Sequence, residues 1–148
     1  MNQLLAYARQ FNSEVLFLTK AYVSKKESDP RATPDDVQRA YRAQKRIAIV
    51  CKEDILYMIK GMGPYLIKYR NLIKEEKWEE FTKMTYDEDI KSTRDESKQK
   101  AAAEYIVFFK DIYADCTPGE KKLLEGKITN MLSIYCQFVL QERDMNGR

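Results

Sequence analysis

The groups in this sequence that could do chemistry are carboxylates and thiols, because histidine is absent. Without histidine the chain lacks the commonest general base and every Ser-His or Cys-His catalytic pair. Its three cysteines, Cys51, Cys116 and Cys136, lack the close C-x₂₋₄-C spacing of zinc sites. An odd number of scattered cysteines also argues against a disulfide framework. We therefore expect reduced thiols, no metal site and no cofactor.

One group of carboxylates has a spacing that could bind Mg²⁺. In "EEKWEE" a continuous helix would bring Glu75, Glu76 and Glu79 close together on one side. This E-E-x-x-E spacing resembles the first half of the motif of all-α nucleoside-triphosphate pyrophosphohydrolases of the MazG type. The second half of that motif, an E-x-x-D on a following helix, is missing. We favour a solvated acidic face without catalytic activity, and keep a Mg-dependent nucleotide pyrophosphohydrolase as the second alternative.

The segment "GMGP", residues 61–64, could hold a phosphate group at a helix start, with Lys68 and Arg70 near. The same residues are typical of a helix end. Glycine accepts left-handed backbone, and Pro64 cannot extend the hydrogen-bond ladder of the preceding helix. We prefer this second interpretation, which predicts a helix boundary at 61–64 and no small-molecule substrate.

The most basic stretch is "VQRAYRAQKRIAIV", residues 37–50. It holds Arg39, Arg42, Lys45 and Arg46 with no acid among them. At about 100° per residue, the three arginines form one row opposite the expected apolar stripe, and Lys45 lies toward one edge. We treat these four residues as a candidate electrostatic binding face. A solvated face is the simplest interpretation, and contact with an acidic protein surface is the next. Nucleic-acid contact is not favoured, because the row is short and the net charge is only +3.

The same predicted helix turns apolar on nearly every side beyond the basic row. Val50 and Tyr57 continue the row, and Leu56 flanks it. A segment that is apolar on two sides is buried by other helices or by a partner. The chain also has ten tyrosines, a residue type enriched in protein interfaces. We therefore predict a protein partner or self-association, with Val50, Leu56 and Tyr57 as the candidate interface.

The elements that position these residues are predicted to be helices. Apolar residues recur at three- and four-residue spacing, and no stretch alternates convincingly at period two. Thr33 with Pro34, and Thr117 with Pro118, have the residue types of helix starts. The apolar stripe of the helix from Pro34 is predicted to include Tyr41. The predicted segments are helices at 3–23, 34–60, from 64 onward with a bend near residue 75, 93–114 and from 118, a polar mobile loop around 85–93, and a frayed tail at 143–148.

These patterns predict an all-α protein, a single antiparallel bundle of about five helices in one domain spanning 1–148. Charge is divided unevenly, with a net of +7 over residues 1–74 and −4 over residues 75–148. The two halves could attract each other within the fold, pair copies, or present a basic face to an anion.

No segment approaches 18 consecutive apolar residues, and the N-terminal residues lack the pattern of a signal peptide. We expect no membrane contact and an intracellular location, in the cytoplasm or nucleus or inside a particle assembled there. The function expected is that of a small helical protein–protein interaction or assembly subunit without catalytic activity. The first alternative is a nucleic-acid-associated helical protein that uses the basic face.

Overall fold

A computed structural model of the chain describes residues 2–83, 109–114 and 116–146. Every regular element in these ranges is a helix and none is a strand, which confirms the all-α prediction. The predicted loop at 85–93 and most of the helix predicted at 93–114 lie outside the described residues. The elements are α1 (Asn2–Ser28), α2 (Pro34–Glu53), α3 (Tyr57–Lys68), α4 (Arg70–Lys74), α5 (Trp78–Lys83), a helical stretch at 109–114, and α8 (Pro118–Asn146).

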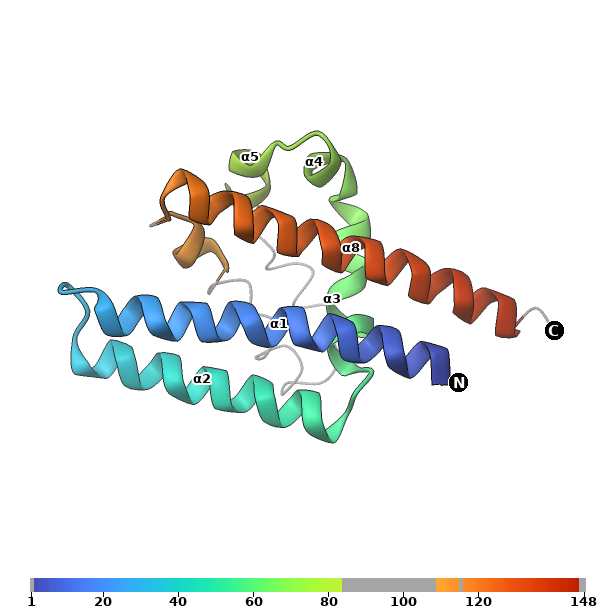
Figure 1. Cartoon of the computed structure of the whole chain (residues 1–148), viewed down its shortest axis with the longest axis horizontal. Helices are drawn as coiled ribbons and strands as arrows, with labels where there is room; N and C mark the ends of the chain where they lie inside the picture. Colours follow the sequence, from blue (N-terminus) through green and yellow to red (C-terminus); the bar gives the residue numbers. More distant parts are fainter. Residues whose placement is uncertain (1, 84–108, 115, 147–148) are drawn as a thin grey trace.

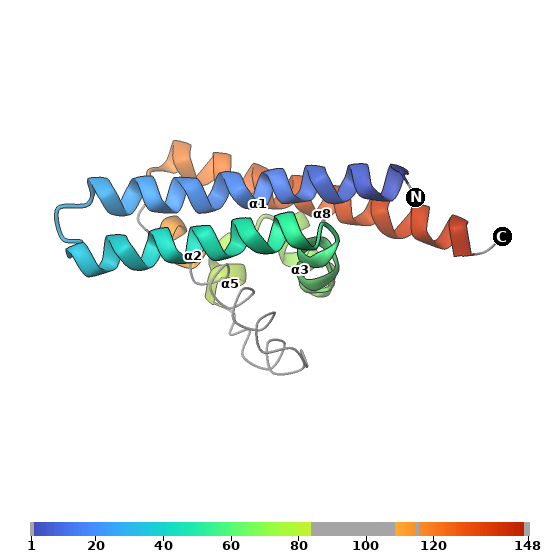
Figure 2. The same ribbon diagram turned by 90° about the horizontal axis from the view of Figure 1, so that it is seen from below.

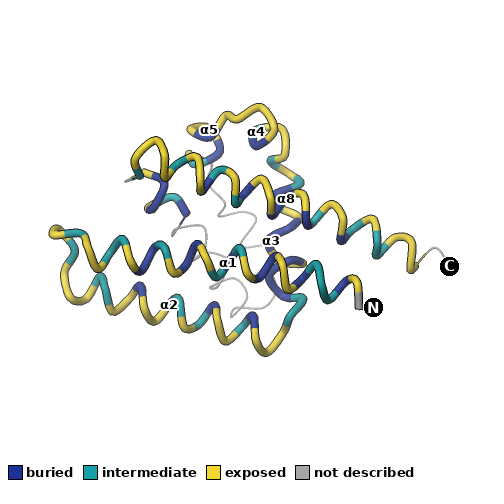
Figure 3. Tube along the Cα trace, in the orientation of Figure 1, coloured by how far each residue is buried: buried dark blue, intermediate teal, exposed yellow. Residues whose placement is uncertain are grey.

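Helix α1 lies between α2 and α8 and packs against both (Figure 1). The chain direction reverses from α1 to α2, and α8 also runs opposite to α1, as in an antiparallel bundle. Figure 2 shows α3 and α5 together on one side of the layer that α1 and α8 form. Buried and exposed residues alternate along α1 and α2 (Figure 3), as amphipathic helices require. The most deeply buried side chains include Phe11, Ile47, Met58, Met131 and Phe138.

The two predicted helix starts are both formed by reciprocal hydrogen bonds. At α2, the Asp36 amide donates to the Thr33 hydroxyl (3.2 Å) and the Thr33 amide donates to the Asp36 carboxylate (3.0 Å). At α8, the Glu120 amide donates to the Thr117 hydroxyl (3.3 Å) and the Thr117 amide donates to the Glu120 carboxylate (2.9 Å). These capping boxes satisfy amides that have no acceptor within the helix.

The boundary predicted near 61–64 is wrong. Helix α2 ends at Glu53, and Asp54 has extended backbone. Helix α3 then begins at Tyr57 and runs through "GMGP", so that Pro64 lies inside it. The turn between the two helices is joined to α1 by the buried Asn12, whose amide nitrogen donates to the Ile55 carbonyl (3.1 Å). The turn therefore depends on a contact with a distant part of the chain.

Close packing explains why position 63 is a glycine although it does not end a helix. A Cβ atom at Gly63 would overlap the ring of Tyr135 on α8, whereas a Cβ at Gly61 would meet nothing within 4 Å. Gly63 is buried, and no described glycine has a positive φ. Its role is close helix packing and not a left-handed turn.

Two of the other predicted helix boundaries differ from the structure, and one agrees with it. Helix α1 continues through Ser28, five residues beyond its predicted end. Residues 143–146, which we expected to fray, are helical and exposed. The bend expected near residue 75 is confirmed, because α4 ends at Lys74 and Glu76 has φ 57. The left-handed backbone at Glu76 interrupts the helical path before α5 begins at Trp78.

Candidate protein interface

Helix α2 packs against α1 through a side made of small residues and one isoleucine. Ala40, Ala43, Ile47 and Cys51 are its buried residues. The prediction that Tyr41 belongs to the apolar stripe is wrong, because Tyr41 is 48% exposed. Alanines let two helix backbones approach closely, and the larger ring then lies outside the contact. The buried side is therefore rotated relative to the predicted one.

This rotation changes which basic residues lie opposite the core. Arg42 and Lys45 are exposed and face away from the buried side, so that Lys45 is central and not marginal as expected. Arg39 is exposed on a flank, and Arg46 is half-buried and interacts within the chain. We define the α2 outer face as the exposed residues Gln38, Tyr41, Arg42, Lys45, Ile49 and Lys52.

The α2 outer face contains two large apolar groups among its charges. Ile49 is 44% exposed, and the ring of Tyr41 is held at the edge nearest α1 because its hydroxyl donates to the Glu27 carboxylate. That hydrogen bond is the first cause that raises the pKa of Tyr41 above its usual value. The face combines cations with an aromatic and an aliphatic group, and the carboxylates of Glu27 and Glu53 lie at its edges.

The candidate interface of Val50, Leu56 and Tyr57 is not laid out as an open surface. Tyr57 is buried in the core, and Val50 and Leu56 are half-buried and pack against it. They pack against the core where α1, α2 and α3 contact one another. Sequence reasoning missed Ile49 as the exposed apolar residue. The helical spacing of Ala40, Ala43 and Ile47 could have indicated that Ile49 is exposed, because these three residues define the buried side of α2.

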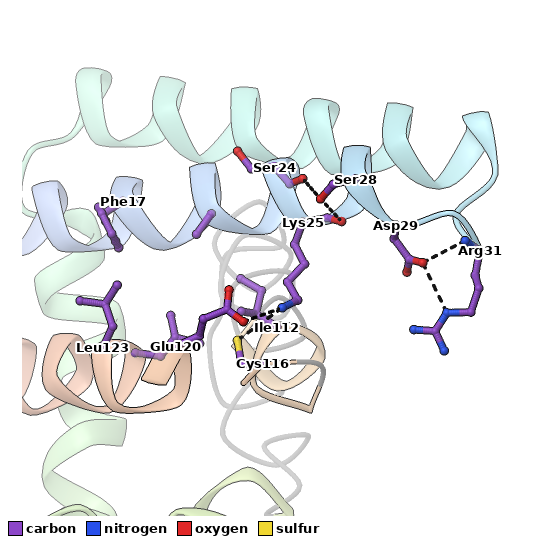
Figure 4. Close-up of a pocket in the computed structure, with 12 residues that line it drawn as sticks. Phe17, Ser24, Lys25, Ser28, Asp29, Arg31, Ile112, Cys116, Glu120 and Leu123 are labelled. Atoms are coloured by element: carbon purple, nitrogen blue, oxygen red, sulfur yellow. Dashed lines mark hydrogen bonds and ion pairs between the residues drawn. The ribbon is translucent and has the colours of Figure 1, made fainter. Parts of the chain in front are cut away.

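A second surface feature is an open cleft of about 520 Å³ between α1 and α8, which we call the α1–α8 cleft (Figure 4). The residues that matter here are Phe17 and Lys25 from α1, Ile112 and Cys116 from the segment before α8, and Glu120 and Leu123 from α8. Phe17 and Leu123 are 40% and 53% exposed. The cleft therefore presents apolar side chains from two helices to solvent.

An ion pair within this cleft and two hydrogen bonds outside its lining hold the surrounding elements together. Lys25 forms an ion pair with Glu120 (3.2 Å), and its ammonium lies 4.0 Å from the Cys116 sulfur. The Tyr22 hydroxyl donates to Asp111 (3.4 Å), and the Tyr113 hydroxyl donates to Glu125 (3.0 Å). Burial, followed by the nearby carboxylates, raises the pKa of Tyr22 and of Tyr113 to about 12. Both tyrosines therefore remain donors across the physiological range and tie the helical stretch 109–114 to α1 and α8.

The carboxylates considered for Mg²⁺ are not brought to one helical face. Glu75 follows the end of α4, Glu76 has left-handed backbone, and Glu79 lies in α5. The predicted break near residue 75 separates them, so the arrangement that a continuous helix would give is not formed. Within the described ranges, no group of three acidic or cysteine side chains is placed to hold a metal ion.

The cysteines are separated in the fold as they are in the sequence. All three lie in the described residues and none forms a disulfide; Cys51 is buried, Cys116 half-buried and Cys136 exposed. Burial raises the pKa of the Cys51 thiol to about 11. Cys51 is thus a thiol that packs in the core.

The chain matches no family model, no curated protein and no solved structure. Among the described helices, none combines the length and apolar character needed to cross a bilayer.

Proposed function

We propose that this chain is a protein–protein interaction subunit that binds an acidic protein surface through the α2 outer face and performs no catalytic step. The observation that carries the proposal is the composition of this face. Arg42 and Lys45 lie beside the exposed Tyr41 and Ile49. Tyrosine and arginine are enriched among the residues that dominate binding free energy at interfaces.

Charge and shape together define the partner. Basic side chains accelerate association with an acidic surface and set its orientation. Ile49 gains from contact only where it is removed from water, which calls for an apolar group on the partner. An acidic protein surface with an apolar centre satisfies these requirements better than a phosphate backbone.

A charge-reversal pair tests the proposal. The bait Arg42→Glu/Lys45→Glu is compared with the wild type and with Lys60→Glu/Lys83→Glu, which changes two other exposed lysines by the same net charge. Proteins captured from the source cells are identified by mass spectrometry, and affinities are measured with the purified partner. We expect a partner with an acidic binding segment that the control retains and the α2 variant binds at least tenfold more weakly. Identical partner sets for the α2 variant and the control would contradict the proposal.

A second variant separates protein from nucleic acid. If Arg39, Arg42, Lys45 and Arg46 instead contacted duplex DNA, log affinity would fall with log salt at a slope of about −3.6. Ile49→Ser would then leave binding unchanged, because it removes no charge. For a protein partner, the same substitution weakens binding through lost apolar contact. Nuclease-sensitive retention that shows this salt slope and tolerates Ile49→Ser would replace the proposed function with the nucleic-acid alternative.

A further inference from the structure

A second cationic surface follows α3 and α4 and is separate from the α2 outer face. Residues 55–74 contain Lys60, Lys68, Arg70 and Lys74 and no acid, and all four of these residues are exposed. We propose that these four residues, which we call the α3–α4 basic row, bind the phosphate backbone of nucleic acid without reading the base sequence. The proposal concerns a different surface from the proposed function and does not depend on it.

The two lysines of α3 lie on one side of that helix. At about 100° per residue, Lys60, Gly61, Pro64 and Lys68 fall within one exposed sector opposite the buried side of α3. Lys60 and Lys68 are about 12 Å apart along the helix axis. Gly61 and Pro64 have no long side chain, and a Cβ at Gly61 would meet nothing within 4 Å. A chain of phosphates can therefore lie along this side and contact both lysines.

Arg70 connects α4 to this row. Its Nη1 donates to the Ile67 carbonyl (2.8 Å), which holds the guanidinium at the C-terminal end of α3, where Lys68 lies. The exposed guanidinium has further N–H donors that can bind phosphate oxygens. Lys74 is the last residue of α4. The row thus includes cations from both helices.

The charge of this segment differs from that of the whole chain. The four cations and no acid of residues 55–74 give it a net charge of +4, although the chain as a whole carries only +3. Acids stand only at its ends in the sequence, where Asp54 precedes it and Glu75 follows it. Glu75 forms an ion pair with Lys77 (3.3 Å). Because salt screens exposed charges beyond about 10 Å, the local charge decides whether a phosphate is attracted.

The composition of the row distinguishes nucleic acid from other acidic partners. None of the large apolar side chains of residues 55–74 is exposed, whereas the α2 outer face has Tyr41 and Ile49. Protein interfaces depend on apolar and aromatic anchors, and binding to a membrane surface depends on apolar side chains that enter the lipid. Phosphate contacts need only cations and N–H donors, and they supply sequence-independent nucleic-acid binding. The nucleic-acid backbone is therefore the partner that this row fits best.

The test compares two triple variants that lose the same charge. Each replaces three exposed cations by glutamine. The row variant is Lys60→Gln/Lys68→Gln/Lys74→Gln. The α2 control is Arg42→Gln/Lys45→Gln/Lys52→Gln. Binding of each full-length protein to labelled duplex DNA is measured by fluorescence anisotropy at increasing salt, and circular dichroism checks that the variants are folded.

The expected results follow from the number of phosphate contacts. At about 0.9 per neutralised phosphate, four contacts give a slope of about −3.6 in log affinity against log salt. The affinity of the wild type should then fall roughly 100-fold between about 50 and 200 mM salt, and that of the α2 control should fall equally. The row variant keeps only Arg70, so its much weaker binding should fall roughly threefold over the same range. Two duplexes of unrelated sequence should bind with equal affinity.

The other outcomes decide against the row. A wild type that does not bind duplex DNA at low salt overturns the proposal, as does an equal loss in both variants, which would show a diffuse charge effect. A loss confined to the α2 control would move the contact to the α2 outer face. Binding to phosphatidylserine vesicles that the row variant loses, without binding to DNA, would assign the row to a membrane surface instead. None of these failures changes the capture of an acidic protein through Arg42 and Lys45, so the two proposals are tested separately.

Discussion

The segments "GMGP" at 61–64 and "TPGE" at 117–120 contain the same two helix-breaking residue types, yet they have opposite structural roles. In "TPGE", Pro118 is the first residue of α8, and Thr117 and Glu120 close the capping box. In "GMGP", all four residues lie inside α3, and Gly63 packs beneath the ring of Tyr135.

The difference shows that some sequence patterns determine structure through nearby residues alone, whereas others depend on distant parts of the fold. The start of α8 is encoded by donors and acceptors within four residues, so its meaning does not depend on the rest of the fold. The glycine in α3 is needed by a ring that belongs to another helix. Substitutions in the two segments should therefore change stability by amounts that differ in sign and size.

The largest effect is expected at Gly63. Gly63→Ala should lower the free energy of unfolding by about 2 kcal/mol, because the added Cβ overlaps Tyr135 and overpacking costs about 1–3 kcal/mol, partly offset by alanine's helix propensity. Denaturant unfolding measures this change. The same substitution in a Tyr135→Ala background should be neutral or stabilising. If Gly63→Ala lowers the free energy of unfolding equally with and without Tyr135, close packing against that ring is not the cause.

A smaller loss of stability is expected from a substitution at the start of α8. Thr117→Ala removes the hydroxyl that accepts from the Glu120 amide, and loss of such a cap costs about 1 kcal/mol. Thr117→Ser keeps the hydroxyl and should retain most of the stability. Thermal unfolding of the three proteins measures both changes. An alanine variant as stable as the serine variant would show that the capping box adds little.

A gain in stability is expected from substitution of Gly61, two positions before Gly63. Gly61 has helical backbone and open space where a Cβ would be. Gly61→Ala should raise the free energy of unfolding by about 0.5–1 kcal/mol, chiefly because the unfolded chain loses freedom. Denaturant midpoints of the wild type and this variant check it. A destabilised Gly61→Ala would mean that "GMGP" is needed as a whole.

The smallest effect concerns pH. The backbone hydrogen bond from Thr117, then Lys25, holds the pKa of Glu120 below its usual value. A carboxyl whose pKa is lowered by folding adds stability that is complete above the unfolded value, about 4.3, and is lost as pH falls through the folded value. Glu120→Gln keeps the acceptor but does not titrate. The stability difference between wild type and Glu120→Gln should therefore shrink on acidification, as measured by melting temperature against pH. A constant difference would contradict the assignment.

The exposure predicted for Arg42 on α2 agrees with the structure, whereas the predicted rotation of the helix about its axis does not. The sequence indicated a basic face on the helix that follows Thr33, and Arg42 and Lys45 are indeed exposed there. It did not reveal that Ala40 and Ala43 define the buried side, because an apolar stripe through Tyr41 has equally good helical spacing. Ile49 was missed for the same reason.

The sequence by itself determined the class of fold and the starts of α2 and α8, because helical periodicity and capping boxes act over a few residues. Only the tertiary structure decided where α2 ends, why Gly63 is glycine, and which side of α2 faces solvent. Each of these depends on groups brought together from distant segments, namely Asn12 with Ile55, Gly63 with Tyr135, and α1 with α2. The cleft lined by Phe17 and Leu123 arises in the same way, since α1 and α8 become neighbours only when the chain is folded.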